Sequence, residues 1–229
     1  MSGAAALLGS LGTALLLSAA APDDSAGPAG QLALQAGAAT ADSGHGRILY
    51  LKHCAACHGA RAWGDGLREI PALAGQRQKY LLLQLARFAS GERPGSVTHG
   101  PAMHDALAPP DVDRPQALAD LAAYLAQAAP DPHPEQSEGR TLEAGRLAYL
   151  EACAACHGSD GGGSERAAIP AIAGQHYSYL LAQLQSFAAG RRSHALFADA
   201  GAALSLQQQQ ALADYLARLG VRAAADEAH

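Results

Sequence analysis

The sequence predicts an all-α protein built from two tandem domains of similar size. Residues 45–93 align without a gap to residues 144–192, and 26 of these 49 positions are identical. An internal match of this length indicates a duplicated domain. No segment alternates polar and apolar residues in the way that strands require, whereas apolar residues recur at helical spacing in several segments.

The expected helices come in three pairs, with one member of each pair in each repeat: 46–53 with 145–152, 76–90 with 175–189, and 115–128 with 206–219. The first pair leads into a cysteine motif. The second pair is followed by glycine, Gly91 or Gly190, which is a common helix stop. The third pair carries leucines at helical spacing, which predicts that these helices pack against the core.

The two domains are predicted to be residues 45–129 and 140–220, joined by a stiff, proline-rich linker at 130–139. Each domain has only about 80 residues, which is small for an apolar core that must stabilise a fold by itself. A bound group that fills part of each core would resolve this difficulty.

The ends of the chain are predicted to lie outside the domains. Residues 1–21 are apolar and end in small residues, which predicts an export signal peptide or, if it is not cleaved, a membrane anchor. Residues 22–44 are rich in Ala, Gly, Ser and Asp and are expected to form a flexible linker. Residues 221–229 are expected to form a C-terminal tail.

The hexapeptide Cys-Ala-Ala-Cys-His-Gly occurs in both repeats, at 54–59 and at 153–158. C-x-x-C-H is the attachment signature of haem c, in which two cysteine sulfurs form thioether bonds with the haem vinyl groups. The motif predicts two covalently attached haem c groups. One would be bound by Cys54 and Cys57 with His58 as the proximal iron ligand, and the other by Cys153 and Cys156 with His157.

Three further residues recur at matching positions and are candidates for the haem pockets. A proline 13 residues after each histidine can accept a hydrogen bond from the Nδ1–H of that histidine and orient its ring. A tyrosine on each second helix is expected to pack on the haem, and an arginine after each helix could pair with a haem propionate. These residues are Pro71, Tyr80 and Arg93 in the first repeat and Pro170, Tyr179 and Arg192 in the second.

The second iron ligand of the first haem is expected in the loop before the closing helix. Met103 lies there and is the only methionine after residue 1. A methionine ligand opposite histidine raises the reduction potential of a haem. His99 and His104 flank this position and are rival ligands.

No methionine follows the second haem motif. Counting back from the closing helix puts Phe197 in the expected ligand position, and phenylalanine has no lone pair for iron. Two interpretations remain open. His194 could bind the iron, giving bis-histidine ligation and a lower potential, or the iron could be five-coordinate or bound to water with Phe197 closing the pocket.

The composition narrows the possible partners. The net charge of −5 argues against a nucleic-acid partner, since such proteins present basic surfaces. It is compatible with a basic redox protein. All four cysteines lie in the two haem motifs, so none remains for a disulfide or a catalytic nucleophile.

Residues 45–220 resemble the dihaem class I cytochromes c of the cytochrome c4 type. The resemblance rests on G-R-x-x-Y, C-A-A-C-H-G, I-P-A-x-A-G-Q and Y-L-L-x-Q-L-x-x-F-A-x-G-x-R, each present twice. It implies two small all-α domains related by a pseudo-two-fold axis, with haems close enough to exchange electrons. It further implies a periplasmic or membrane-attached protein. The family's distal methionine has a match only in Met103, because Phe197 stands where the second is expected.

The resemblance implies electron transport rather than catalysis. The expected partners are redox proteins, such as a quinol-oxidising complex or a dehydrogenase as donor and a terminal oxidase as acceptor. One alternative is a haem subunit of a larger dehydrogenase. Another is a haem enzyme or small-molecule binder that uses an open second haem, for example in weak peroxidase activity.

Overall fold

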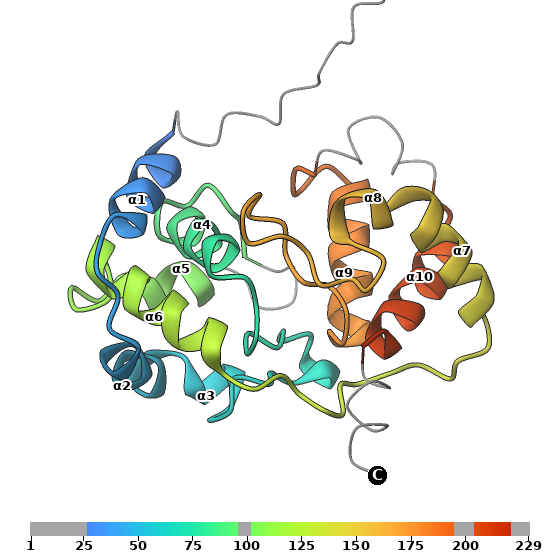
Figure 1. Cartoon of the computed structure of the whole chain (residues 1–229), viewed down its shortest axis with the longest axis horizontal. Coiled ribbons are helices and arrows are strands. Elements are labelled where there is room, and N and C mark those ends of the chain that lie inside the picture. Colours follow the sequence, from blue (N-terminus) through green and yellow to red (C-terminus); the bar gives the residue numbers. More distant parts are fainter. Residues whose placement is uncertain (1–26, 96–101, 195–203, 221–229) are drawn as a thin grey trace, which may run out of the picture.

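The computed structural model describes residues 27–95, 102–194 and 204–220. It confirms an all-α fold of two domains that lie side by side (Figure 1). Within these ranges, extended pairing is limited to one isolated bridge per repeat, Asp65–Ile70 and Ser164–Ile169. None of the helices in the described part of the chain is long and apolar enough to cross a membrane.

The helices follow the predicted pairs closely. The first domain contains α1 (Pro28–Gly37), α2 (Ser43–His53), α3 (Ala55–His58), the 3-10 turn η1 (Gly66–Arg68), α4 (Gln78–Ala89), α5 (Ala102–Leu107) and α6 (Pro115–Gln127). The second domain contains α7 (Leu142–Ala152), α8 (Ala154–His157), α9 (Tyr177–Ala188) and α10 (Leu206–Arg218). Each domain has its own cluster of buried apolar side chains.

Helix α1 is the main departure from the sequence expectation. The flexible linker expected at 22–44 is wrong over this stretch, because α1 is a helix that packs on α4 and α6. Proline at its first position suits a helix start, and Ala29 and Ala36 are almost fully buried. Small residues that resemble a linker in composition therefore serve here to bring one helix close to two others.

The same close helix crossing builds both domains. A Cβ added to Gly46 of α2 would lie 2.0 Å from the backbone oxygen of Asp120 in α6. A Cβ added to Gly145 of α7 would lie 2.1 Å from the backbone oxygen of Ala211 in α10. Only glycine allows this approach, so the first helix of each repeat docks on the last one in the same way.

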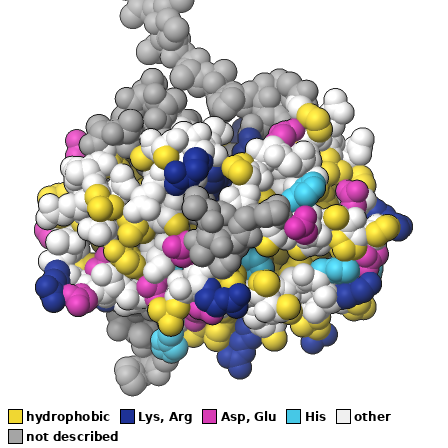
Figure 2. Space-filling model, turned by 180° about the vertical axis from the view of Figure 1, so that it is seen from behind, with side chains coloured by type: hydrophobic (Ala, Val, Ile, Leu, Met, Phe, Trp, Pro, Cys, Tyr) yellow, Lys and Arg dark blue, Asp and Glu magenta, His cyan; other side chains and the backbone are white. Residues whose placement is uncertain are grey.

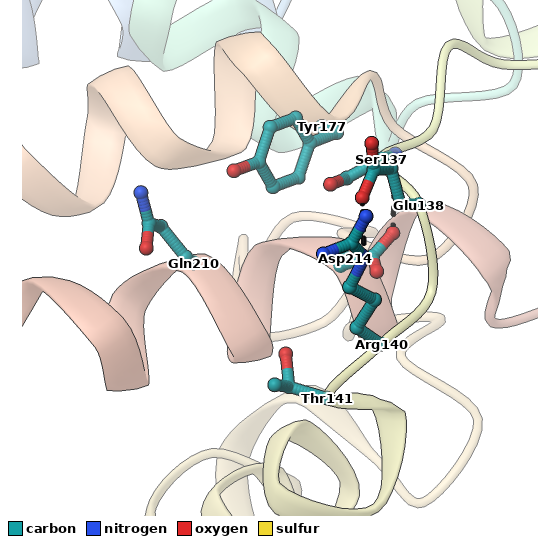
Figure 3. Close-up of a pocket in the computed structure, with 7 residues that line it drawn as sticks. All are labelled: Ser137, Glu138, Arg140, Thr141, Tyr177, Gln210 and Asp214. Atoms are coloured by element: carbon teal, nitrogen blue, oxygen red, sulfur yellow. Dashed lines mark hydrogen bonds and ion pairs between the residues drawn. The ribbon is translucent and has the colours of Figure 1, made fainter.

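The linker lies along the second domain, where Asp214 of α10 holds it. The carboxylate accepts hydrogen bonds from the backbone N–H groups of Ser137, at 3.1 Å, and Gly139, at 2.9 Å. Arg218 donates to the same carboxylate at 3.2 Å. Figure 3 shows Ser137 and Asp214 among the residues that line a polar cavity of about 190 Å³, which none of the cysteine-motif residues lines.

Two glutamines join the domains by an exchange of hydrogen bonds. The side-chain amide of Gln76 donates to the backbone oxygen of Ala171 at 2.9 Å and accepts from its N–H at 2.8 Å. Gln175 makes the same pair of bonds to Ala72, at 2.8 Å and 2.9 Å. Because the two glutamines occupy equivalent positions in the repeats, the contact has a pseudo-two-fold symmetry. We call these four residues the glutamine clamp.

Replacing Gly46 with alanine should destabilise the first domain, because the new methyl group collides with the α6 backbone. We expect a loss of about 2–3 kcal/mol in unfolding free energy, typical of overpacking a rigid contact. Thermal unfolding of the haem-loaded protein measures it. Gly37→Ala is the control, since nothing lies within 4 Å of its added Cβ. Equal melting temperatures for the two variants would contradict the crossing described here.

Replacing Gln175 with alanine should weaken the attachment between the domains. The change leaves the N–H and C=O of Ala72 without these partners, which costs about 1–3 kcal/mol for each group that stays buried. We expect calorimetry of the haem-loaded protein to show two separated transitions or one broadened transition. Gln185→Ala, on the exposed side of α9, should leave the wild-type transition unchanged. A clamp variant with that same unaltered transition would show that the clamp contributes nothing.

Candidate haem-binding sites

Each cysteine motif forms a short helix at a bend in the chain. Helices α2 and α7 end at His53 and Ala152, directly before the first cysteine of each motif, and α3 and α8 carry the Ala-Ala-Cys-His that follows it. The first cysteine of each pair is half-buried and the second is exposed, and none of the four forms a disulfide within the described ranges. Burial, and then the neighbouring cysteine, raises the pKa of Cys54 and of Cys153 to about 11. These inner sulfurs are therefore protonated thiols, able to add S–H across a vinyl group.

The two motif histidines are buried and held in one orientation. The Nδ1 atom of His58 lies 3.1 Å from the carbonyl oxygen of Pro71, and that of His157 lies 3.1 Å from the carbonyl oxygen of Pro170. A carbonyl oxygen only accepts, so Nδ1 carries the proton and Nε2 keeps the lone pair that an iron ligand needs. Burial lowers the pKa of both histidines, and the hydrogen bond offsets this only in part.

Two tyrosines that the sequence analysis gave no role close the turn after each histidine. Tyr50 is fully buried, and its hydroxyl donates to the carbonyl oxygen of Gly59 at 2.5 Å. Tyr149 makes the equivalent bond to Gly158. Burial raises the pKa of Tyr149 to about 12, so the phenol stays a donor. Their fixed place four residues before each motif was the sequence signal for this role.

The two candidate propionate arginines come together at the boundary between the domains. Arg93 donates to the side-chain oxygen of Gln84 at 2.8 Å and to the hydroxyl of Tyr179, in the other domain, at 3.2 Å. Arg192 lies 3.5 Å from the same Gln84 oxygen and also bonds Gln183. Each guanidinium in addition lies over a ring of its own domain, Phe88 or Phe187, at 4.4 Å and 4.7 Å.

Within the described ranges, no carboxylate balances the positive charge of this arginine cluster, because neither Arg93 nor Arg192 forms an ion pair there. Burial opposes ionisation of Tyr179, but the two guanidiniums outweigh it and hold the pKa of this phenol below its usual value. The hydroxyl of Tyr80 also interacts with Arg93.

The residues present fit haem c. The Nε atom of Arg93 is buried and has no hydrogen-bond partner in the described part of the chain, as expected where an anionic group belongs. Haem supplies such groups in its two propionates. The unpaired thiols and the oriented histidines supply the other contacts that the motif requires. Arginine, tyrosine and glutamine side chains from both domains would hold the propionate side.

On the distal side of the first domain, Met103 is half-buried on α5, a helix that packs against α4. Its rival His104 is exposed, and its Nδ1 atom lies 3.0 Å from the carbonyl oxygen of Phe88. His99 lies outside the described residues. Met103 thus lies on a helix that packs against α4, and one nitrogen of His104 faces the backbone.

In the second domain, His194 approaches His157, the predicted proximal ligand. Its ring centroid lies 6.1 Å from that of His157, and the ring planes differ by only 10°. Phe187 of α9 packs against the His194 ring, with the ring centroids 4.9 Å apart. Burial lowers the pKa of His194, and the charges of His157 and Arg192 lower it further. Phe197 lies outside the described residues.

Comparison with known proteins identifies what the chain is similar to. The family model for cytochrome c matches residues 44–129 and 142–220. Cytochrome c4 of Azotobacter vinelandii is 34% identical over 170 residues, covering 71% of this chain and 78% of the relative. The thiosulfate dehydrogenase electron acceptor of Stutzerimonas stutzeri strain A1501 is 35% identical over 178 residues, covering 73% and 79%.

Two solved structures share the fold and the domain arrangement. Reduced recombinant cytochrome c4 from Pseudomonas stutzeri superposes with a TM-score of 0.67 at 28% identity, covering 79% of this chain and all of that one. Thiosulfate dehydrogenase TsdBA from Marichromatium purpuratum superposes with a TM-score of 0.64 at 32% identity. The match spans 76% of this chain and 40% of the dehydrogenase.

Replacing Arg93 with glutamine should lower the reduction potential of at least one haem. A guanidinium beside the propionates disfavours the ferric form, which carries one more positive charge. Its loss should shift the midpoint by roughly 40 mV, or about 1 kcal/mol for a one-electron couple. Spectroelectrochemical titration measures the shift. Arg191→Gln removes the same charge from an exposed neighbour of the cluster, and its potentials should stay at wild-type values. Equal shifts in both variants would contradict the placement of Arg93 beside a haem propionate.

Proposed function

The chain belongs to the cytochrome c family and carries electrons on two covalently attached haem c groups, and we propose that it is an exported shuttle between a dehydrogenase and a terminal acceptor. One observation carries the proposal. Both pockets reach the boundary between the domains, where Arg93 of one domain hydrogen-bonds Tyr179 of the other. A protein that binds two redox groups on either side of one rigid contact is suited to pass electrons in single steps.

The residues of the chain keep each haem in place and tune it. When bound, haem iron supplies the one-electron change between its ferric and ferrous forms. The cysteines fix the porphyrin, and His58 and His157 present neutral Nε2 atoms whose direction the proline carbonyls set. The arginine cluster would balance propionate charge at the domain boundary. No side chain has to move a proton or attack a substrate for this task.

A dehydrogenase is the proposed donor because two kinds of relative point to one. Two relatives are named thiosulfate dehydrogenase electron acceptors, in Thiomonas intermedia and in Stutzerimonas stutzeri. The chain also resembles part of a thiosulfate dehydrogenase chain in a solved structure. These likenesses support a donor that oxidises a reduced sulfur compound, in preference to a quinol-oxidising complex. They equally support the variant in which the chain serves as a haem subunit of such an enzyme.

The surface supports a protein partner. Figure 2 shows one face of the molecule, on which basic and acidic side chains are interspersed and apolar side chains lie between them. The net charge of the whole chain is −5. A mixed surface on a mildly acidic chain suits brief docking of another redox protein.

Export is proposed from the composition of the first residues of the chain. The apolar segment 1–21 ends in small residues, as signal peptides do. A periplasmic site is therefore the proposed location. A membrane anchor through this segment stays a prediction of the sequence analysis, since these residues lie outside the described ranges.

Loading and reduction of the protein test the proposal. After production in a bacterium that attaches haem, the chain should gain the mass of two haems that acid acetone does not remove. Stopped-flow mixing of the ferric protein with a thiosulfate dehydrogenase and thiosulfate should then reduce both haems.

The matched control removes one attachment site. A variant with Cys153→Ala and Cys156→Ala should carry one haem and take up half as many electrons per chain. A colourless product would contradict the cofactor assignment. A fully loaded protein that this donor leaves ferric, but that another donor reduces, would contradict the choice of partner alone.

A further inference from the structure

The two repeats differ in the residues that are available as distal iron ligands. The first repeat has Met103 and has glycine, Gly95, two residues after Arg93. The second repeat lacks a methionine after its cysteine motif and has His194 two residues after Arg192. The first repeat therefore offers a thioether as a candidate ligand and the second offers an imidazole, and the two side chains stand at different positions of the repeat.

Backbone hydrogen bonds fix the turn that precedes His194. After α9 it turns at Gly190, whose φ of 67° suits glycine. The N–H groups of Arg191 and Arg192 both donate to the backbone oxygen of Ser186, at 2.9 Å and 3.3 Å. These bonds fold the segment back over the last turn of α9, two residues before His194.

The separation of the two imidazoles equals the separation expected for two ligands on one iron. A bond from a metal to an imidazole nitrogen is about 2 Å, so rings bound on opposite faces of one ion have centroids about 6 Å apart. The centroids of His157 and His194 are 6.1 Å apart, and their planes are within 10° of parallel. Phe187, packed against His194 at 4.9 Å, limits the rotation of its ring.

We infer that His194 is the sixth ligand of the second haem iron, opposite His157. The inference rests on the proposed function in that it requires two bound haems. It makes the second haem bis-histidine, whereas the first is expected to be histidine–methionine through Met103. Methionine ligation raises the reduction potential relative to bis-histidine ligation, so the first haem is the stronger electron acceptor of the two. At partial reduction, electrons therefore collect on the first domain.

Low-temperature electron paramagnetic resonance of the ferric, fully loaded protein tests the ligand. The wild type should show two low-spin haems. In His194→Ala, half of the iron should become high-spin, and added imidazole should restore the low-spin signal. His133→Ala is the control, because this exposed histidine lies in the linker between the domains, and it should leave both signals unchanged. A high-spin haem in the wild type, or two low-spin haems in His194→Ala without imidazole, would overturn the inference.

A second variant keeps a ligand in place. In His194→Met, the charge-transfer band of methionine-bound ferric haem should double in intensity, and the lower of the two midpoint potentials should rise. An unchanged band together with two unchanged potentials would overturn the inference as well. The covalent mass of two haems is measured on every sample, so failure of this ligand assignment stays distinct from failure of the dihaem assignment.

Discussion

The hydrogen bond between each motif histidine and a proline carbonyl lies at the centre of this structure. It fixes the ring of the iron ligand, and the proline that supplies it stands one residue before a partner of the glutamine clamp. Pro71 precedes Ala72, which Gln175 of the other domain holds, and Pro170 precedes Ala171, which Gln76 holds. The loop that orients each ligand is thus the loop that joins the domains. One short loop in each domain therefore serves both the contact between the domains and the orientation of a predicted iron ligand.

Much of the fold was predictable because the chain contains two copies of one domain sequence. The repeat alignment gave the helix pairs, and the C-x-x-C-H spacing gave the attachment residues. The proline carbonyls could be predicted as well, because the offset of 13 residues recurs. The flexible linker expected before the first domain was wrong over α1, because composition does not distinguish a loose segment from a helix of small residues in close contact. Ala29 and Ala36 are buried, which becomes visible only when α4 and α6 are in place.

The contacts between the domains could not be predicted from the sequence. Gln76 and Gln175 lie in the repeated motif I-P-A-x-A-G-Q, yet nothing in that motif says that each glutamine bonds the opposite repeat. The arginines were recognised as candidate propionate partners, but their meeting around Gln84 follows from the rotation that relates the domains. Likewise, the distance between His157 and His194 depends on how the chain turns after α9. Loop spacing alone left two interpretations of that haem open.

The meeting of the two guanidiniums also links the prosthetic groups to the closed form of the molecule. Arg93 and Arg192 converge on one amide oxygen and one phenol. Like charges in such a confined place repel, which opposes the attraction between the halves. Porphyrin carboxylates placed beside the guanidiniums would remove this repulsion, so a loaded polypeptide would close more firmly than an empty one.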